Sequence, residues 1–242
     1  MLRLPKGAIR PRKAVLDMAS YVPPTGDRLG KLRLDFNENT VGCSPRVMEF
    51  LRSKLTPELL SVYPDYREVK ETLAAHFHVD PSQFILTNGT DEAIQVFINT
   101  YVDDGNDVLH LAPSYAMYRF YAEVAGASIR EVRYVPPDLQ FPIDELLDAI
   151  RPETRAVLIS NPNNPTGALA TLTQIERILK RARRAVVLID EAYFEFCGIT
   201  ALPLLEQFSN LFVSRTFSKV YGMAAMRIGC LFSHAEIGRA HV

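Results

Sequence analysis

Short apolar segments alternate with amphipathic helical patterns along most of this chain, and that alternation limits the folds open to it. Seven segments are rich in apolar residues, as buried parallel strands are, rather than regularly alternating in polarity. They comprise residues 84–87, 107–111, 129–134, 155–160, 186–190, 211–214 and 228–232. Because strands that alternate with helices are joined by right-handed crossovers, the pattern predicts an α/β fold with a mostly parallel, doubly wound sheet flanked by helices.

Two helix starts carry local signals. Thr90 precedes Asp91 and Glu92, whose negative charges suit the positive end of a helix dipole. Thr173 and Glu176 have the spacing of a capping box, which predicts that a second helix begins at Thr173.

Length and charge exclude several classes of protein. A chain of 242 residues can bury a sizeable core, and its net charge of -1 produces no strong field that would attract nucleic acid or a membrane surface. The first 33 residues differ, because eight basic and two acidic residues leave them with a charge of +6. Such an arm can bind nucleic acid or act as a targeting segment, but we expect a solvated arm that packs on a partner subunit.

The three cysteines, Cys43, Cys197 and Cys230, lie far apart and form no CxxC pair. This spacing is typical of a reducing compartment and argues against a disulfide framework or a zinc site. No apolar stretch has the length of a signal-peptide core or a membrane span. We therefore expect a cytoplasmic protein with no metal site and no nucleic-acid or membrane partner.

Polar and glycine-containing clusters directly follow five of the predicted strands. In open α/β sheets, ligands bind outside the carboxyl ends of the strands, so these loops are expected to line one site. The clusters are residues 88–91, 113–115, 161–167, 190–193 and 216–219.

The residue types in these clusters point to a specific chemistry. Lys219 offers an amine that can form a Schiff base. Residues 89–91, at a predicted helix N-terminus, offer backbone N–H groups to a phosphate, and Arg227 offers the same phosphate a bidentate fork. Asp190 can hold a protonated ring nitrogen. Three further residues complete the set, Tyr193 and Asn164 as hydrogen-bond donors and Tyr115 as a flat stacking surface.

Three motifs in order resemble those of the class I/II aminotransferases, which are pyridoxal-phosphate (PLP) enzymes of fold type I. They are Asn-Pro-Thr-Gly at residues 164–167, Asp-x-x-Tyr at 190–193, and Ser-Lys at 218–219 followed eight residues after the lysine by Arg227. Each motif is weak alone, but the ordered set is specific, and the resemblance covers residues 20–235. It implies an N-terminal arm at residues 1–35 and the large PLP-binding domain of that fold at residues 36–235.

Within that family, the segments Asn-Glu-Asn at 37–39 and Tyr-Pro-Asp at 63–65 are similar to histidinol-phosphate aminotransferases. That resemblance implies conversion of histidinol phosphate and 2-oxoglutarate to imidazole acetol phosphate and glutamate, a step of histidine biosynthesis. An aromatic aminotransferase or a phospho-amino-acid decarboxylase would use the same cofactor set. An inactive fragment that binds PLP or dimerises is the third alternative. The chain has neither G-x-G-x-x-G nor G-x-x-x-x-G-K-[ST], which argues against a dehydrogenase or a kinase.

The resemblance also implies roles for individual residues. Lys219 would carry PLP and move a proton between substrate and cofactor, while Asp190 would keep the pyridine nitrogen protonated. Asn164 and Tyr193 would hydrogen-bond the phenolic oxygen of the ring, and Tyr115 would stack on it. The phosphate would be held by Thr90, Asp91, Thr216, Ser218 and Arg227.

Three residues are expected at the edge of the site. Tyr63 is expected to reach the phosphate in a neighbouring subunit, which implies a homodimer. Tyr21 and Asn37 are expected to contact the substrate, an amino donor or a keto acid.

The end of the chain departs from the family pattern. A smaller C-terminal domain, which carries the arginine for the substrate α-carboxylate, is expected to be missing, and residues 236–242 are expected to be a non-native tail. Because one wall of the site would then be absent, we expect this chain to bind PLP weakly and to turn over slowly.

Overall fold

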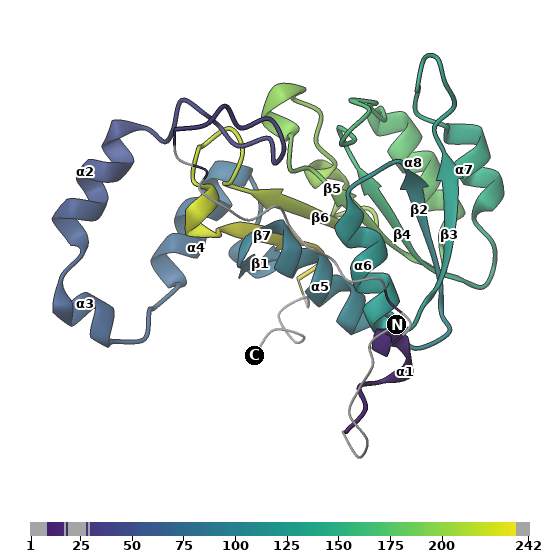
Figure 1. Cartoon of the computed structure of the whole chain (residues 1–242), viewed down its shortest axis with the longest axis horizontal. Helices are drawn as coiled ribbons and strands as arrows, with labels where there is room; N and C mark the ends of the chain where they lie inside the picture. The colour runs from purple at the N-terminus through teal and green to yellow at the C-terminus, as the bar shows by residue number, and fades with distance from the viewer. Residues whose placement is uncertain (1–8, 17, 19–27, 29, 236–242) are drawn as a thin grey trace.

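The computed structural model describes residues 9–16, 18, 28 and 30–235. These residues form a seven-stranded sheet with the order β1-β7-β6-β5-β4-β2-β3 (Figure 1). The strands are β1 Phe84–Thr87, β2 Asp107–Ala112, β3 Ser128–Arg133, β4 Thr154–Ser160, β5 Val186–Asp190, β6 Leu211–Thr216 and β7 Gly229–Phe232. Every predicted strand is present, and each boundary lies within two residues of its predicted place.

Two strands depart from the prediction of buried parallel strands. β7 runs antiparallel to both of its neighbours, β1 and β6. The crossover between parallel strands usually contains an α-helix, whereas residues 217–228, which join β6 and β7, contain only the short 3₁₀ helix η4 (Ala224–Met226). β3 pairs only with β2 and lies at the edge of the sheet, which explains why Ser128 and Arg133 are exposed.

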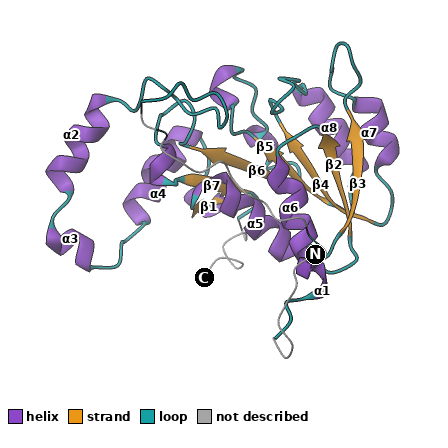
Figure 2. Ribbon diagram, in the orientation of Figure 1, coloured by secondary structure: helices purple, strands orange, loops and turns teal. Residues whose placement is uncertain are grey.

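Helices cover both faces of the sheet, as Figure 2 shows. On one face, α5 (Gly89–Tyr101) and α6 (Ala116–Ala125) pack against Leu158, Leu188 and Phe212. On the other face, α4 (Arg67–Phe77), α7 (Ile143–Ala149) and α8 (Leu172–Arg181) cover a second apolar cluster. Each face buries fully enclosed aliphatic side chains, so the doubly wound arrangement is confirmed.

The start of α8 corrects one prediction. The cap is Thr171, whose side chain accepts a hydrogen bond from the backbone N–H of Gln174, while the Gln174 side chain accepts one from the backbone N–H of Thr171. Thr173, the predicted cap, lies inside the first turn. The Thr-x-x-Gln/Glu pattern occurs twice with an offset of two residues, and the earlier copy has the extended backbone that an N-cap requires.

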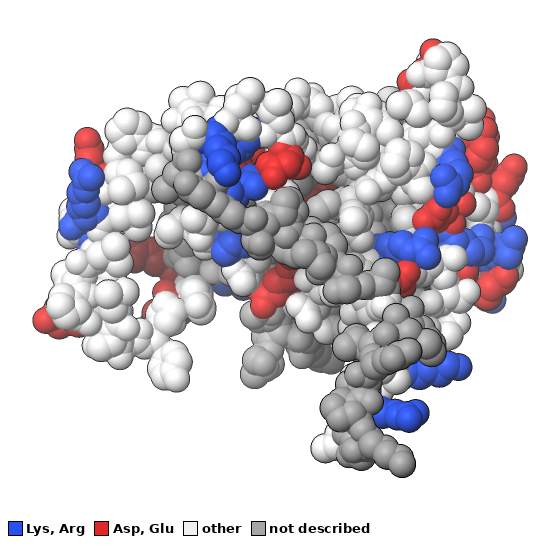
Figure 3. Space-filling view, in the orientation of Figure 1, with Lys and Arg blue, Asp and Glu red and all other residues white. Residues whose placement is uncertain are grey.

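The remaining described helices have three to ten residues. The α-helices are α1 (Lys13–Leu16), α2 (Pro45–Lys54) and α3 (Pro57–Ser61), and the 3₁₀ helices are η1 (Pro81–Gln83), η2 (Phe194–Phe196) and η3 (Leu202–Leu204). α2 and α3 extend away from the sheet (Figure 1). On the face seen in Figure 3, acidic and basic side chains are interspersed. Within the part of the chain that the structure describes, no helix combines the length and the apolar character needed to cross a bilayer.

A buried ion pair ties the ends of β5 and β6 to the loop that follows β5. Arg215 Nη2 lies 2.7 Å from Glu191 Oε2, and both side chains are almost completely buried. The same carboxylate accepts hydrogen bonds from the Thr200 hydroxyl and the Ala201 backbone N–H. The Arg215 guanidinium also lies 3.6 Å from the centroid of the Phe194 ring. This pair therefore fixes the backbone next to Asp190.

We expect Arg215→Met to lower the free energy of unfolding by about 3–5 kcal/mol, because it leaves the Glu191 carboxylate buried without a countercharge. The matched control is Lys180→Met, since Lys180 forms an exposed i,i+4 pair with Glu176 on α8, and its loss should cost about 0.3–0.5 kcal/mol. Urea unfolding of both variants measures the difference. Equal losses would contradict a structural role for the buried pair.

Candidate active site

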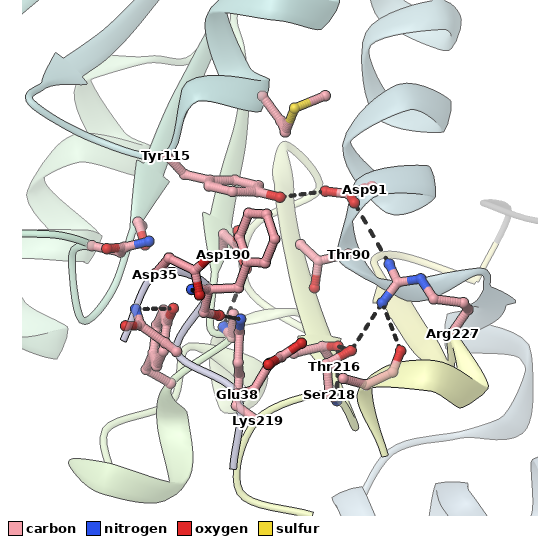
Figure 4. A pocket seen from close by; sticks show the side chains of 18 of the residues that line it. Asp35, Glu38, Thr90, Asp91, Tyr115, Asp190, Thr216, Ser218, Lys219 and Arg227 are labelled. Atoms are coloured by element: carbon pink, nitrogen blue, oxygen red, sulfur yellow. Dashed lines mark hydrogen bonds and ion pairs between the residues drawn. The ribbon is translucent and has the colours of Figure 1, made fainter. Parts of the chain in front are cut away.

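A cavity of about 670 Å³ lies at the carboxyl ends of β4, β5 and β6, beside the first turns of α5 and α6. The structure brings eleven of the predicted site residues to its wall (Figure 4). These are Asn37, Thr90, Asp91, Tyr115, Asn164, Asp190, Tyr193, Thr216, Ser218, Lys219 and Arg227. Tyr63 lies away from the cavity and is fully exposed on the segment after α3, and Tyr21 lies outside the described residues.

One end of the cavity has the donors that an anion requires. Arg227 Nη1 donates to the Ser218 hydroxyl at 3.2 Å, and Nη2 lies 3.5 Å from a carboxylate oxygen of Asp91. The Thr90 hydroxyl is buried and has no hydrogen-bond partner among the described residues. Gly89 has a φ of +75°, and a Cβ there would lie 2.4 Å from Arg227 Nη2, so only glycine lets the guanidinium approach this backbone. An arginine, an unpartnered hydroxyl and a helix N-terminus together fit a phosphate.

The Asp91 carboxylate contacts two other residues of the cavity wall. Its carboxylate accepts a hydrogen bond from the Tyr115 hydroxyl at 2.7 Å and pairs with Arg227. A negatively charged side chain repels a phosphate, so the side chain orients Tyr115 and Arg227. Its predicted contact with the phosphate can come only from the backbone N–H at the start of α5.

The opposite part of the cavity contains a buried carboxylate. Asp190 ends β5, and in the parallel register it lies beside Ser160 of β4 and Ser214 of β6. It accepts hydrogen bonds from the Tyr118 hydroxyl at 2.8 Å, the Ser214 hydroxyl at 2.9 Å and the Ala192 backbone N–H at 3.1 Å. Burial raises the pKa of Asp190 to about 6, and these donors limit the rise because they stabilise the charged form.

Lys219 lies between these two regions (Figure 4). Its Nζ donates to the Phe36 carbonyl oxygen at 2.7 Å and lies 5.7 Å from the centroid of the Tyr193 ring. Burial lowers the pKa of Lys219, although nearby acidic groups such as Asp91 oppose this shift. Partial desolvation increases the fraction of neutral amine, which is the form that attacks a carbonyl.

Two amide-bearing segments complete the wall. Asn37 Nδ2 donates to the Tyr193 hydroxyl at 2.9 Å, which links the segment before α2 to the end of β5. The loop that contains Asn164 is held by the buried Asn163, whose side chain donates to the Pro113 carbonyl and the Thr166 hydroxyl. The hydrogen bonds of Asn163 thus position Asn164 at the cavity.

Several wall residues were not predicted from the sequence. Asp35, Phe36, Glu38, Met117, Ser160, Ala192, Ala224 and Ala225 line the cavity, and Tyr118 supports it from behind. Asp35 and Glu38 belong to the stretch that contains Asn37, so their proximity was a usable signal. Tyr118 follows Tyr115 by three residues on one helix face, but nothing local indicates its contact with Asp190. Among the described residues, no group of three His, Cys, Asp or Glu side chains is placed to hold a metal ion.

The family follows from this fold and site together with a sequence match over residues 30–241. That stretch matches the model of the aminotransferase class I and II family, so the chain belongs to it. Among curated relatives, the "Histidinol-phosphate aminotransferase" of a Geobacillus species is 38% identical over 205 residues, which covers 82% of this chain and 55% of the relative.

Two solved structures show the same fold at low sequence identity. The histidinol-phosphate aminotransferase of Sinorhizobium meliloti, described as a complex with pyridoxal-5'-phosphate, is 26% identical, with a TM-score of 0.75 over 85% of this chain and 57% of that one. The enzyme of that name from Clostridium acetobutylicum gives the same identity and TM-score over 84% of this chain and 61% of that one. The chain thus spans little more than half the length of the proteins it resembles.

We expect Asp190→Asn to stabilise the cofactor-free protein, increasingly so as the pH rises from 4 to 7. The pKa of Asp190 is raised from 3.8 to about 6, so the stability that the protonated carboxyl contributes is present at low pH and lost as the pH rises through 6. A shift of this size corresponds to about 3 kcal/mol. Urea unfolding of wild type and variant across this range measures the difference.

The control for this experiment is Asp144→Asn, which makes the same chemical change at an exposed carboxylate on α7. It should produce no comparable rise. A pH-independent difference for Asp190→Asn would show that the carboxylate is not held in a desolvated site.

Proposed function

We propose that this chain is the cofactor-binding part of a PLP-dependent aminotransferase. The observation that carries the proposal is the joint presence of an amine, a buried carboxylate and a guanidinium in one cavity, from Lys219, Asp190 and Arg227. The bound cofactor would supply an electron sink for the carbon next to the substrate nitrogen. The chain would supply attachment, orientation and proton transfer. Residues 36–235 would form the cofactor-binding domain, preceded by an arm at residues 1–35.

Each wall residue has a role that follows from its chemistry. Lys219 would attach to the cofactor aldehyde and, when released, carry a proton at Nζ. Asp190 would hold the proton of the ring nitrogen, and Tyr115 would cover one face of the ring. Asn164 and Tyr193 would donate to the phenolic oxygen. The phosphate would contact Thr90, Thr216, Ser218, Arg227 and the backbone N–H of Asp91.

We infer that the amino donor is histidinol phosphate, with 2-oxoglutarate as acceptor, in histidine biosynthesis. The support is the 38% identity to a protein named for that reaction and the Asn-Glu-Asn and Tyr-Pro-Asp segments. Asn37, which contacts Tyr193 at the cavity wall, is placed to meet the substrate, and Tyr21 is proposed as a second contact. Three free cysteines fit a reducing compartment, so we place the reaction in the cytoplasm.

We also propose a homodimer in which Tyr63 completes the phosphate site of the neighbouring subunit. Tyr63 is fully exposed and lies on the segment between α3 and α4, which extends from the body of the molecule. Leu60 on α3 and Val62 directly after it are also exposed, and both are apolar side chains that a second subunit would cover.

Saturating PLP should give the purified protein a visible absorbance band that borohydride abolishes, because the Lys219 amine condenses with the cofactor aldehyde. Lys219→Ala should remove the band, and Lys180→Ala, which changes an exposed lysine on α8, should leave it intact. A band that survives in Lys219→Ala would contradict the lysine assignment. Histidinol phosphate should change the wild-type spectrum at lower concentration than aromatic amino acids or phosphothreonine, and a reversed order would overturn the substrate assignment.

The dimer proposal predicts a solution mass of twice one chain by sedimentation. Tyr63→Phe should raise the Kd for PLP about tenfold, because a hydrogen bond to a charged phosphate is lost. Tyr66→Phe makes the same change at a nearby exposed tyrosine and should leave the Kd unchanged. A monomeric protein, or equal effects of the two variants, would contradict the role of Tyr63.

A further inference from the structure

We propose that Tyr118 is a positioning residue that orients Asp190 and keeps one of its oxygens available to the ring nitrogen of the cofactor. This inference rests on the proposed function. Tyr118 lies on α6 with a fully buried side chain, and its hydroxyl donates to Asp190 Oδ2 at 2.8 Å. A buried phenol needs a partner, and the partner here is a carboxylate of the candidate active site.

The distribution of donors over the carboxylate singles out Tyr118. Oδ1 of Asp190 accepts from both the Ser214 hydroxyl and the Ala192 backbone N–H. Among the described residues, Tyr118 is the one hydrogen-bond donor that reaches Oδ2. A carboxylate has about four acceptor sites, so these three donors leave one site, on Oδ2. The orientation of that free site therefore depends on the Tyr118 hydroxyl.

The surroundings fix the tyrosine in turn. The Tyr118 ring packs edge-on against Tyr115, with ring centroids 5.8 Å apart, and Tyr115 lies on the cavity wall. The first turn of α6 thus positions both a flat wall of the cavity and the hydroxyl behind it. Burial raises the pKa of Tyr118 well above its ordinary value, so the phenol remains a donor throughout the working range of pH.

The hydroxyl is separable from the packing role of the ring. A phenylalanine at this position keeps the aromatic volume in the cluster with Leu158 and Leu188, and removes only the donor. Without that donor, the Asp190 anion loses stabilisation and its free site is no longer held in one direction. A larger fraction of the carboxyl is then protonated near neutral pH and cannot accept the proton of a ring nitrogen, although the fold is retained.

The test compares Tyr118→Phe with Tyr134→Phe, which makes the same change at another buried tyrosine that does not contact Asp190. With PLP added, Tyr118→Phe should raise the Kd about tenfold, the loss expected for one hydrogen bond to a charged group. It should also move the pH midpoint of the visible band upward, because the pyridine ring of the cofactor withdraws electrons less strongly when its nitrogen is less fully protonated. Tyr134→Phe should change neither quantity. Tyr118→Met, which also lacks the hydroxyl, serves if the phenylalanine variant does not fold.

A second arm needs no cofactor. In the cofactor-free protein, loss of the donor should raise the pKa of Asp190 further, so the decline in stability with rising pH should extend to higher pH in Tyr118→Phe than in wild type. If Tyr118→Phe matches Tyr134→Phe in the spectrum, the Kd and this pH profile, the inference is wrong. If wild type shows no visible band with PLP, the proposed function fails instead, and the cofactor-free arm still decides whether Tyr118 controls Asp190.

Discussion

The desolvated carboxylate of Asp190 is the constraint on which the site depends. Asp190 and Glu191 are consecutive acidic residues at the end of β5, and their side chains have different partners. Glu191 has a positive partner in Arg215 and serves the fold. Asp190, among the described residues, receives hydrogen bonds only from neutral groups, two hydroxyls and an amide. A buried anion whose direct hydrogen-bond donors are all neutral favours a ligand that brings a cation, and a protonated ring nitrogen is such a group.

The lysine loop is placed by contacts from a distant part of the chain. Lys219 donates to the Phe36 carbonyl, and Asn39 Nδ2 donates to the Val220 carbonyl at 2.9 Å. Together with the contact from Asn37 to Tyr193, these bonds lay residues 35–39 across the cavity. Attachment of the amine to a cofactor would alter the first of these bonds, so the segment that borders the cavity is linked to the state of the lysine.

The sequence was sufficient to predict those parts of the fold and the site that local patterns determine. Apolar runs located the strands, and the polar clusters after β1, β2, β4, β5 and β6 supplied nine of the predicted residues in the cavity wall, because strand ends in a parallel sheet meet at one edge. The sequence was insufficient to predict strand directions and side-chain pairs that depend on tertiary packing. The reversal of β7 and the Glu191–Arg215 pair both depend on neighbours far along the chain. No local pattern singled out Tyr118, because the two residues of its contact with Asp190 are 72 positions apart in the sequence.

The short antiparallel return from β6 to β7 has a consequence for ligand selection. Both ends of residues 217–228 are anchored in the same sheet, so Lys219, near one end, and Arg227, near the other, cannot move apart freely. The loop therefore selects a ligand whose aldehyde and anionic group are separated by the distance between Lys219 and Arg227. A vitamer without the phosphate could still contact the Lys219 amine and the Asp190 carboxylate, yet it would leave Arg227 without an anionic partner.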